Sequence, residues 1–403
     1  MERALSLSDG DTFEIDPSDE SEDDSNARAE DASNAVVAAT DWTAETILNQ
    51  LRRGNIELNP SFQRRDAWTV DRKSRFIESL MMGIPIPQLV LAERPGQRGR
   101  YIVIDGKQRL LSLAQYAGFL DGSARNSFTL SRLTLRPDLN GVNFAKLQDE
   151  PVWNNDLNAL ENSTIRTVVI RNWPSEEYLY LVFHRLNTGS VPLSPQELRQ
   201  ALHPGPFTDF VDKYSFESMS FRAALGLRGP DFRMRDAELM TRAFSFLYFL
   251  EDYSGNLKQF LDLTCKSLNA RWDAESDRIV DSAHSLDKAI DACIEIFGQN
   301  VFRRYVGSSY ENRFNRAIFD VQVLFLADPK VRVKALKQAA ATRSAFEKLS
   351  ASSAFAEATT STTKSITATY TRLALWSKSL TEVLGPVAPR VELINNRIVR
   401  RGV

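Results

Sequence analysis

One stretch of the sequence, Tyr101–Leu110, combines the residue types that bind phosphate groups and metal ions. An apolar, β-branched run leads into Asp105, and Gly106 allows a tight turn before a polar start to a helix. The N–H groups of a helix N-terminus suit an anion, and Lys107 and Arg109 would add positive charge. Asp105 could hold a hydrated metal ion. An ordinary strand–turn–helix with surface charges explains the same residues, so the pattern alone leaves both interpretations open.

A second polar segment, Phe62–Trp68, holds two adjacent arginines, a carboxylate and an aromatic residue ahead of an expected helix. Its arginines, Arg64 above all, are candidates for facing a phosphate. Trp68 is either a stacking platform or a core residue, and we favour the core. The alternative for Arg65 and Asp66 is a solvated ion pair.

A third segment, Phe183–Ser194, follows an apolar helical pattern. Asn187 and Gly189 can end that helix through a left-handed residue, but the Asn187 amide could also bind a base or a phosphate. His184 stands alone within the preceding helix, and a structural role is favoured over a catalytic one.

The elements that must position these segments follow from hydrophobic periodicity and from helix-start and helix-stop residues. Helices are expected at 44–51, 71–82, from within 105–109 to about 119, and 176–186, and strands at 56–58, 88–93, 100–104 and 165–171. Ser194 and Glu197 form a capping box that begins a further helix. Residues 120–163 are expected to be irregular, with weak strand signals at 128–135.

Strand signals fade after Pro206, which predicts an α+β domain followed by a mostly α-helical one. Further helices are expected at 236–250, 277–297, 311–325, 332–349 and 365–384. The predicted organisation is a disordered acidic tail at 1–38, an α+β domain at 40–205, a helical domain at 206–385 and a basic tail at 386–403.

Composition narrows the class of protein. The 403 residues are 43% hydrophobic and 25% charged, which suits a globular chain and excludes wholesale disorder and collagen-like repeats. Two cysteines, Cys265 and Cys293, exclude a disulfide scaffold and suit a reducing cytoplasm, and we expect no membrane association. Residues 1–34 carry twelve acids and two bases, a net charge of −10, so the rest of the chain is +8. That asymmetry is compatible with a nucleic-acid partner, although a solubilising tail explains it too.

Taken together, the three segments resemble the N-terminal domain family of the GmrSD-type restriction endonucleases. The resemblance covers about 45–205, with a weaker echo at 233–242. The matching residues, in chain order, are Gln63-Arg64 with Trp68, Phe76–Leu80, Gly83–Pro87, Asp105–Leu110, Phe183 with Leu186–Gly189, and Glu197–Ala201.

This resemblance implies a ParB/sulfiredoxin-like fold that binds a nucleoside triphosphate with Mg²⁺. The residues implied for catalysis are Asp105, Gln108 and Arg109, with Asp105 also as the metal ligand. Those implied for nucleotide binding are Gln63, Arg64, Gly106, Lys107, Asn187 and Thr188. The implied partners are the nucleotide, DNA and a separate nuclease subunit.

Departures from the family pattern put hydrolysis in doubt more than ligand binding. Lys107 stands where the family usually has Gln, and Ser190 where it usually has Gly. Family members often carry a His-Asn-His nuclease domain, but the three histidines of this chain show no metal-site spacing. The spacing of Asp320, Asp328 and Lys330 echoes a nuclease pattern, and we interpret it as accidental.

Two functions remain open from the sequence. One is an NTP-hydrolysing component of a DNA-targeting defence system, and the other is a non-enzymatic module that senses DNA or a nucleotide and recruits a nuclease. In either case we expect Arg64 and Arg109 to face one cleft, because a triphosphate needs more cations than one helix end supplies.

Overall fold

The structure is a computed structural model, and its chain forms two compact units. It describes residues 14–15, 35–58, 66–119, 127–186, 194–227, 231, 233–360 and 364–401. The N-terminal unit comprises Ser25–Leu202 with Phe232–Met234, and the C-terminal unit comprises Met1–Asp24, His203–Asp231 and Arg235–Val403. Each unit is described by itself.

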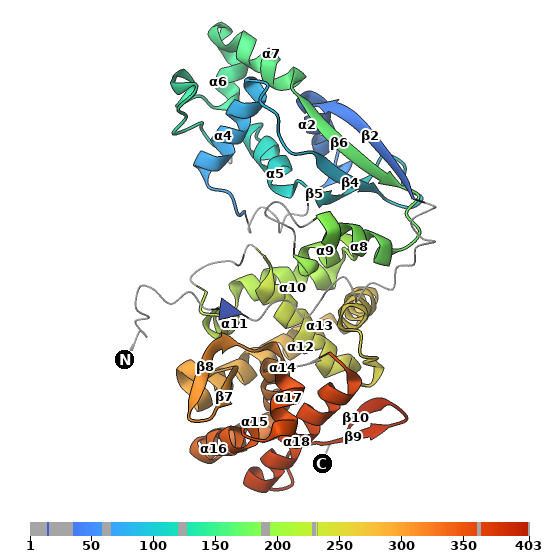
Figure 1. Ribbon diagram of the computed structural model, residues 1–403, viewed down its shortest axis with the longest axis vertical. Helices are drawn as coiled ribbons and strands as arrows, with labels where there is room; N and C mark the ends of the chain where they lie inside the picture. The colour runs from blue at the N-terminus through green and yellow to red at the C-terminus, as the bar shows by residue number, and fades with distance from the viewer. Residues whose placement is uncertain are drawn as a thin grey trace. The chain divides into compact units, whose positions relative to one another are not determined.

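A five-stranded mixed sheet organises the N-terminal unit (Figure 1). The strands, in spatial order, are β2 (Val36–Thr43), β6 (Thr164–Arg171), β4 (Leu89–Glu93), β5 (Tyr101–Asp105) and β3 (Ile56–Glu57). β4 and β5 form an antiparallel hairpin, whereas β4 runs parallel to β6. β5 therefore runs in the opposite direction to β4 and β6. Its carboxyl end, where Asp105 lies, is next to the amino ends of those two strands.

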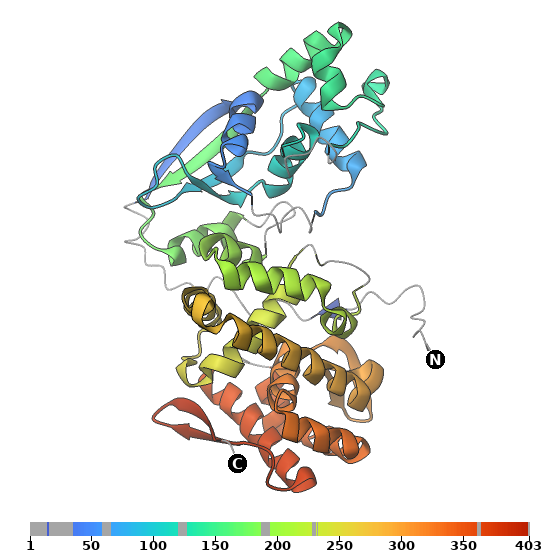
Figure 2. The ribbon, with the colours of Figure 1, turned by 180° about the vertical axis from the view of Figure 1, so that it is seen from behind.

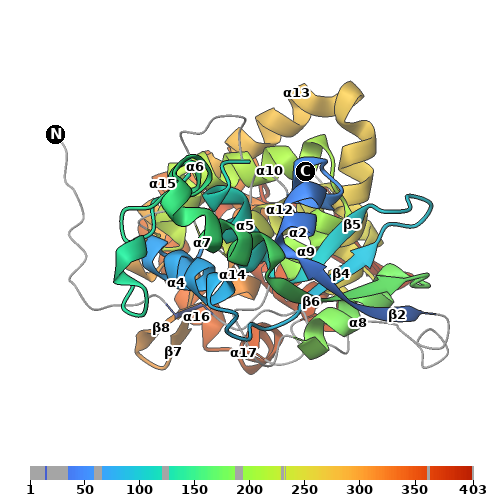
Figure 3. The same cartoon turned by 90° about the horizontal axis from the view of Figure 1, so that it is seen from above.

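Helices cover both faces of this sheet, because alternate residues of β4 and β5 point to opposite sides. Leu91 and Val103 belong to the core on one face of the sheet, whereas Ala92 and Ile102 belong to the core on the other face. The first face is covered by α2 (Ala44–Arg52), α4 (Val70–Met81), α5 (Lys107–Tyr116) and α7 (Asn154–Asn162), which Figure 3 shows from above. The second face is covered by α8 (Glu176–Leu186) and α9 (Pro195–Leu202).

Two expectations for this unit are wrong. β2 begins at Val36, so residues 36–38 belong to the sheet and not to a disordered tail. Residues 128–135 contain no strand, and the segment that follows forms α6 (Phe144–Asp149), α7 and two short 3-10 helices, Pro137–Leu139 and Pro151–Trp153. The reason is that side-chain oxygen atoms accept hydrogen bonds from the backbone N–H groups of this segment. The N–H of Ser131 donates to Ser74 Oγ at 3.0 Å, and that of Arg136 donates to Glu78 Oε1 at 2.8 Å, so these groups need no neighbouring strand.

The C-terminal unit is mostly helical, as predicted (Figure 2). Its helices are α10 (Pro206–Glu217), α11 (Met219–Ala224), α12 (Arg235–Phe249), α13 (Leu257–Phe297), α14 (Arg316–Leu326), α15 (Pro329–Lys337), α16 (Ala339–Ser350), α17 (Ser353–Thr360) and α18 (Ile366–Leu384). The expected helix at 277–297 is the second half of α13, and the one expected at 332–349 is divided at Gln338. None of the described helices combines the length and the hydropathy that a membrane span requires.

Two hairpins replace elements expected in this unit. β7 (Arg303–Val306) pairs with β8 (Ser309–Phe314), so the helix expected from 311 begins at Arg316 instead. β9 (Arg390–Ile394) pairs with β10 (Arg397–Arg401), so the expected basic tail at 386–403 is a hairpin over those residues. Its turn uses Asn395 and Asn396, both with positive φ. Asparagine tolerates that conformation, and two such residues match the twist of a tight hairpin.

Candidate functional site

The turn between β5 and α5 places the central motif at the N-terminus of a helix. Gly106 is the N-cap of α5 and adopts a left-handed conformation, with φ 96° and ψ 13°. A Cβ at this position would collide with Cδ2 of Leu89 and would lie 3.1 Å from Nη2 of Arg109. Only glycine therefore permits both the turn and the close approach of the Arg109 side chain.

Asp105 and Arg109 form a partly buried ion pair across this turn. Nη2 of Arg109 donates to Oδ2 of Asp105 at 3.0 Å and to the carbonyl oxygen of Gln88 at 2.9 Å. The Arg109 side chain is 7% exposed and that of Asp105 is 25% exposed. The guanidinium is held in place by the carbonyl group of the residue that precedes β4, while the carboxylate keeps access to solvent.

Two buried polar atoms in the first turns of α5 have no hydrogen-bond partner among the described residues. They are Nε of Arg109, a donor, and Oε1 of Gln108, an acceptor. Buried polar atoms are nearly always hydrogen-bonded, and a bound polar group or a water at this helix N-terminus would satisfy both. The first N–H groups of a helix also lack intrahelical acceptors. This arrangement suits an anion that carries both acceptor and donor groups.

Lys107 is turned toward α9. Its ammonium forms a buried ion pair with Oε1 of Glu197, and the two side chains are 3% and 5% exposed. Oε2 of Glu197 accepts the N–H of Ser194 at 2.6 Å, while Ser194 Oγ accepts the N–H of Glu197 at 3.1 Å. The predicted capping box is thus confirmed, and its glutamate is also the counter-ion of Lys107. The role of Lys107 in nucleotide binding stays a prediction.

The other predicted nucleotide-binding residues, Gln63, Arg64, Asn187 and Thr188, lie outside the described residues. The expectation that Arg64 and Arg109 face one cleft is therefore untested.

The described end of the second segment packs against the core. Trp68 is partly buried and lies edge-on to Phe76, with ring centroids 5.8 Å apart, which agrees with the favoured structural interpretation. Asp66 is not a simple solvated group, because its carboxylate forms an ion pair with Lys73 and accepts Nε2 of Gln115 at 2.9 Å. Gln115 is on α5, so Asp66 connects the loop to the helix that carries the motif. The sequence did not predict the contact with Gln115, because 49 positions separate it from Asp66.

His184 packs in the manner of a structural residue. Its ring contacts those of Tyr180 and Phe183, with centroids 4.4 Å and 5.3 Å away. This agrees with the favoured structural role.

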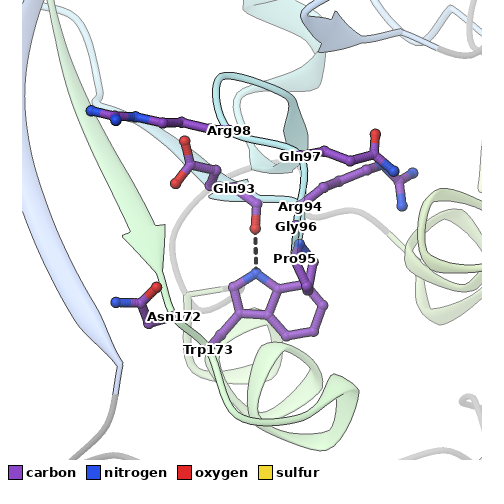
Figure 4. Close-up of a pocket in the computed structure, with 8 residues that line it drawn as sticks. All are labelled: Glu93, Arg94, Pro95, Gly96, Gln97, Arg98, Asn172 and Trp173. Atoms are coloured by element: carbon purple, nitrogen blue, oxygen red, sulfur yellow. Dashed lines mark hydrogen bonds between the residues drawn. The ribbon is translucent and has the colours of Figure 1, made fainter.

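A hollow of about 450 Å³ lies at the other end of β5 from Asp105. It is lined by the β4–β5 turn and the residues after β6, namely Glu93–Arg98, Asn172 and Trp173 (Figure 4). Glu93 pairs with Tyr101, four residues before Asp105, so about 13 Å of strand separates the two places. Nε1 of Trp173 donates to the carbonyl oxygen of Glu93 at 2.6 Å. This hollow is not part of the motif site.

Asp105 by itself offers too few oxygen atoms to hold a magnesium ion, so a bound nucleotide would have to supply further ligands. Within the described ranges, no three His, Cys, Asp or Glu side chains come together as a metal site. Mg²⁺ is commonly held by one or two carboxylates together with substrate phosphates and water. The partly exposed Asp105 carboxylate could supply the protein ligand, with a nucleotide supplying the phosphate oxygens.

The nuclease-like spacing in the C-terminal unit has a structural explanation. Asp320 is buried between two arginines, with Oδ2 2.6 Å from Nη2 of Arg242 and 3.4 Å from Nη2 of Arg372. Asp328 caps α15 by accepting the N–H of Lys330 at 2.7 Å. The accidental interpretation of this spacing is consistent with both contacts.

The comparison with protein families concerns the N-terminal unit. A family model described as GmrSD restriction endonuclease, N-terminal domain, matches residues 44–204. These residues are similar to the GmrSD N-terminal domain family. The match runs from α2 to the end of α9 and so includes the turn at Gly106, the ion pair of Asp105 with Arg109, and Lys107.

Comparison with individual proteins found no match, either among curated proteins or among solved structures. The fold is mixed α and β in the N-terminal unit, and its ParB/sulfiredoxin-like assignment stays a prediction.

Proposed function

We propose that the chain is a component of a DNA restriction or phage-defence system, and that its N-terminal unit binds and hydrolyses a nucleoside triphosphate. The observation that carries the proposal is the match of residues 44–204 to a restriction endonuclease domain, with the Asp105–Arg109 turn inside it. We further propose that this chain acts in the cytoplasm on DNA together with a separate nuclease subunit, the partners that the similarity to a restriction endonuclease domain implies.

The local chemistry of the turn supports phosphate binding. Nε of Arg109 is buried and has no partner among the described residues, so a phosphate oxygen there would satisfy it. The N-terminal N–H groups of α5 would add hydrogen bonds, and the helix dipole would add favourable potential. When bound, Mg²⁺ would neutralise the charge that develops on the phosphates. Asp105 would hold the hydrated ion or orient the attacking water.

A second candidate function is a non-enzymatic module that senses DNA or a nucleotide and recruits a nuclease. Two ion pairs favour it. Lys107 is engaged by Glu197, and Asp105 is engaged by Arg109, so both charges already have counter-ions. A site neutralised in this way can bind a ligand without activating water.

Phosphate release with each NTP, with and without Mg²⁺ and DNA, tests the first function. Asp105→Asn keeps the size of the side chain and an acceptor for Arg109, and we expect it to bind nucleotide yet lose at least ~100-fold in turnover. The matched control is Asp138→Asn, which alters another aspartate paired with an arginine, Arg136, on the surface of the same unit. The control should hydrolyse as the wild type does.

Each outcome separates the two functions. Equal turnover in Asp105→Asn and wild type would rule out the catalytic assignment. Nucleotide binding without phosphate release in the wild type would favour the sensing module. If calorimetry detects no nucleotide binding at all, the assignment of the site at α5 is wrong.

A further inference from the structure

The outer face of the β9–β10 hairpin gathers arginine side chains. Successive residues of a strand alternate between the two faces of a hairpin, and Ile398 is fully buried, so the residues next to it in the chain face outward. Three arginines belong to this outer face, and all are exposed: Arg390, Arg397 and Arg401. Figures 1 and 2 show the hairpin projecting from the side of the helices of the C-terminal unit.

Two of these arginines oppose each other across the hairpin. Arg390 is paired directly with Arg401 in the strand register, and like charges in that position destabilise a sheet. Nε of Arg401 lies 3.1 Å from Oε2 of Glu392, whereas Arg390 and Arg397 form no ion pair with any described residue. Charge that only protects an edge strand needs no opposed cations. The arrangement is better suited to holding an anion from outside the chain.

A second basic surface lies on α15. Lys330, Lys334 and Lys337 are exposed and recur at helical spacing, so they share one side of the helix, while the buried Val331 faces the core. We call these three residues the lysine stripe. The ammonium of Lys334 donates to the carbonyl oxygen of Leu384 at 3.2 Å. Lys330 and Lys337 form no ion pair with any described residue, so the stripe presents positive charge to solvent.

The last turn of α14 brings the hairpin and α15 together. Nη1 of Arg400, on β10, donates to the carbonyl oxygen of Leu324 at 3.4 Å. Nη1 of Arg332, on α15, donates to the carbonyl oxygen of Leu326 at 2.8 Å. A helix rises only ~1.5 Å per residue, so these two carbonyl groups are close together. The hairpin and the lysine stripe are therefore carried by neighbouring elements, although they are far apart in the sequence.

The charge of these two elements is strongly positive. Residues 390–401 contain four arginines and one glutamate, and residues 328–337 contain four cations and one aspartate, a net charge of +6. β10 also contacts the 3-10 helix Leu250–Asp252, whose Glu251 and Asp252 are exposed and form no ion pair with the hairpin. With those two acids included the net charge is +4, so the region attracts polyanions.

We propose that the outer face of the hairpin and the lysine stripe together bind the phosphate backbone of B-form DNA, with the hairpin in the major groove. A two-stranded β-ribbon fits this groove, which is ~12 Å wide. Arg397 and Arg401 lie at the two ends of β10, ~13 Å apart along the strand, so their side chains can reach phosphates on both sides of the groove. The choice of DNA among polyanions rests on the proposed function. The inference does not depend on the nucleotide site.

Anisotropy of a short fluorescent DNA duplex, measured over a series of salt concentrations without NTP, tests this surface. One double variant is Arg390→Gln with Arg397→Gln, and the other is Lys330→Gln with Lys337→Gln, because none of these side chains has an ion pair to lose among the described residues. Each should weaken binding at least ~10-fold at ~0.1 M salt and reduce the slope of log K against log salt by ~1.8, the value for two lost phosphate contacts. The quadruple variant should reduce the slope by ~3.6.

Three controls separate charge at this surface from charge in general. Lys213→Gln with Lys288→Gln removes two exposed lysines from α10 and α13 and should change affinity less than ~2-fold, because distant charges are screened by salt. Arg390→Lys with Arg397→Lys keeps both charges and should keep the slope. An RNA duplex of the same sequence should bind more weakly, because its deep, narrow major groove does not admit the ribbon.

The proposal is overturned if the wild type binds no DNA, or if the quadruple variant keeps the affinity and slope of the wild type. It is also overturned if the Lys213 and Lys288 control loses as much affinity as either double variant, or if the RNA duplex binds as tightly as the DNA duplex. Circular dichroism checks that each variant is folded. Phosphate release is measured separately on the same proteins. A chain that binds DNA through this surface without releasing phosphate would overturn the NTPase proposal alone, and a chain that releases phosphate without binding DNA here would overturn only this inference.

Discussion

The ion pair between Lys107 and Glu197 makes the sharpest test of how the candidate site is held together. Both groups are almost fully buried, with side chains 3% and 5% exposed, and 90 positions separate them in the chain. Replacing one partner leaves the other charge buried without its counter-ion, which typically costs ~3–5 kcal/mol. We therefore expect Lys107→Gln and Glu197→Gln each to lower the free energy of unfolding by about that amount.

The double variant should be less destabilised than either single variant. With both charges removed, two neutral amides remain that can hydrogen-bond to each other, and we expect a net loss of only ~1–2 kcal/mol. An amide at 197 can still accept the N–H of Ser194, so α9 keeps part of its cap. The double variant also places at 107 the glutamine that the family usually has.

Urea denaturation of the four proteins gives the coupling energy directly. The matched control is the exposed pair of Arg166 and Asp41, with a closest contact of 3.3 Å and side chains 58% and 53% exposed. Neutralising either of those residues should cost less than ~1 kcal/mol. Additive single losses at Lys107 and Glu197, or losses as small as those of the control, would refute the claim that a buried pair joins α5 to α9.

Three further predictions follow from the same structure. Gly106→Ala should destabilise the fold by ~1–3 kcal/mol and weaken any ligand at α5, because the new methyl group meets Leu89 in a left-handed backbone; thermal melts and ligand titration check both effects. Deleting residues 1–34 should leave the melting temperature of the N-terminal unit nearly unchanged. Deleting residues 1–38 should lower that temperature, because it removes three residues of β2. Equal melting temperatures for the two variants would show that this end of β2 contributes nothing to stability. Burial raises the pKa of the Asp287 carboxyl, so the folded chain favours its protonated form and stability should fall as pH rises through that raised pKa; Asp287→Asn should lose this dependence in urea titrations from acidic to neutral pH.

Much of the N-terminal fold was predictable because its signals are local. Hydrophobic periodicity identified α2, α4, α5 and α8, and apolar, β-branched runs bounded by turn residues identified β4, β5 and β6. β2 was harder to identify, because it is an edge strand with an exposed, partly polar sequence, and its stability comes from pairing with β6. The β9–β10 hairpin was missed because its arginines suggested a solvated tail, although Ile398 is fully buried.

For the candidate site, too, the sequence predicted the local features and not the contacts between distant residues. The motif from Asp105 to Arg109, the glycine turn and the start of α5 are set by neighbouring residues, and the sequence was enough to predict them. What that motif's side chains contact was not predictable, because the partners come from distant parts of the chain. Lys107 meets a glutamate of α9, and Arg109 meets a carbonyl group of Gln88.

The sequence by itself determined the similarity of residues 44–204 to a known family. It also determined the order of most elements and the position of the motif at a strand–helix turn, because turns, caps and periodic apolar faces depend on residues a few positions apart. Only the tertiary structure decided which charges are already neutralised. An ion pair such as that of Lys107 with Glu197 forms when packing brings two charges together and excludes water, and neither event is recorded in local spacing.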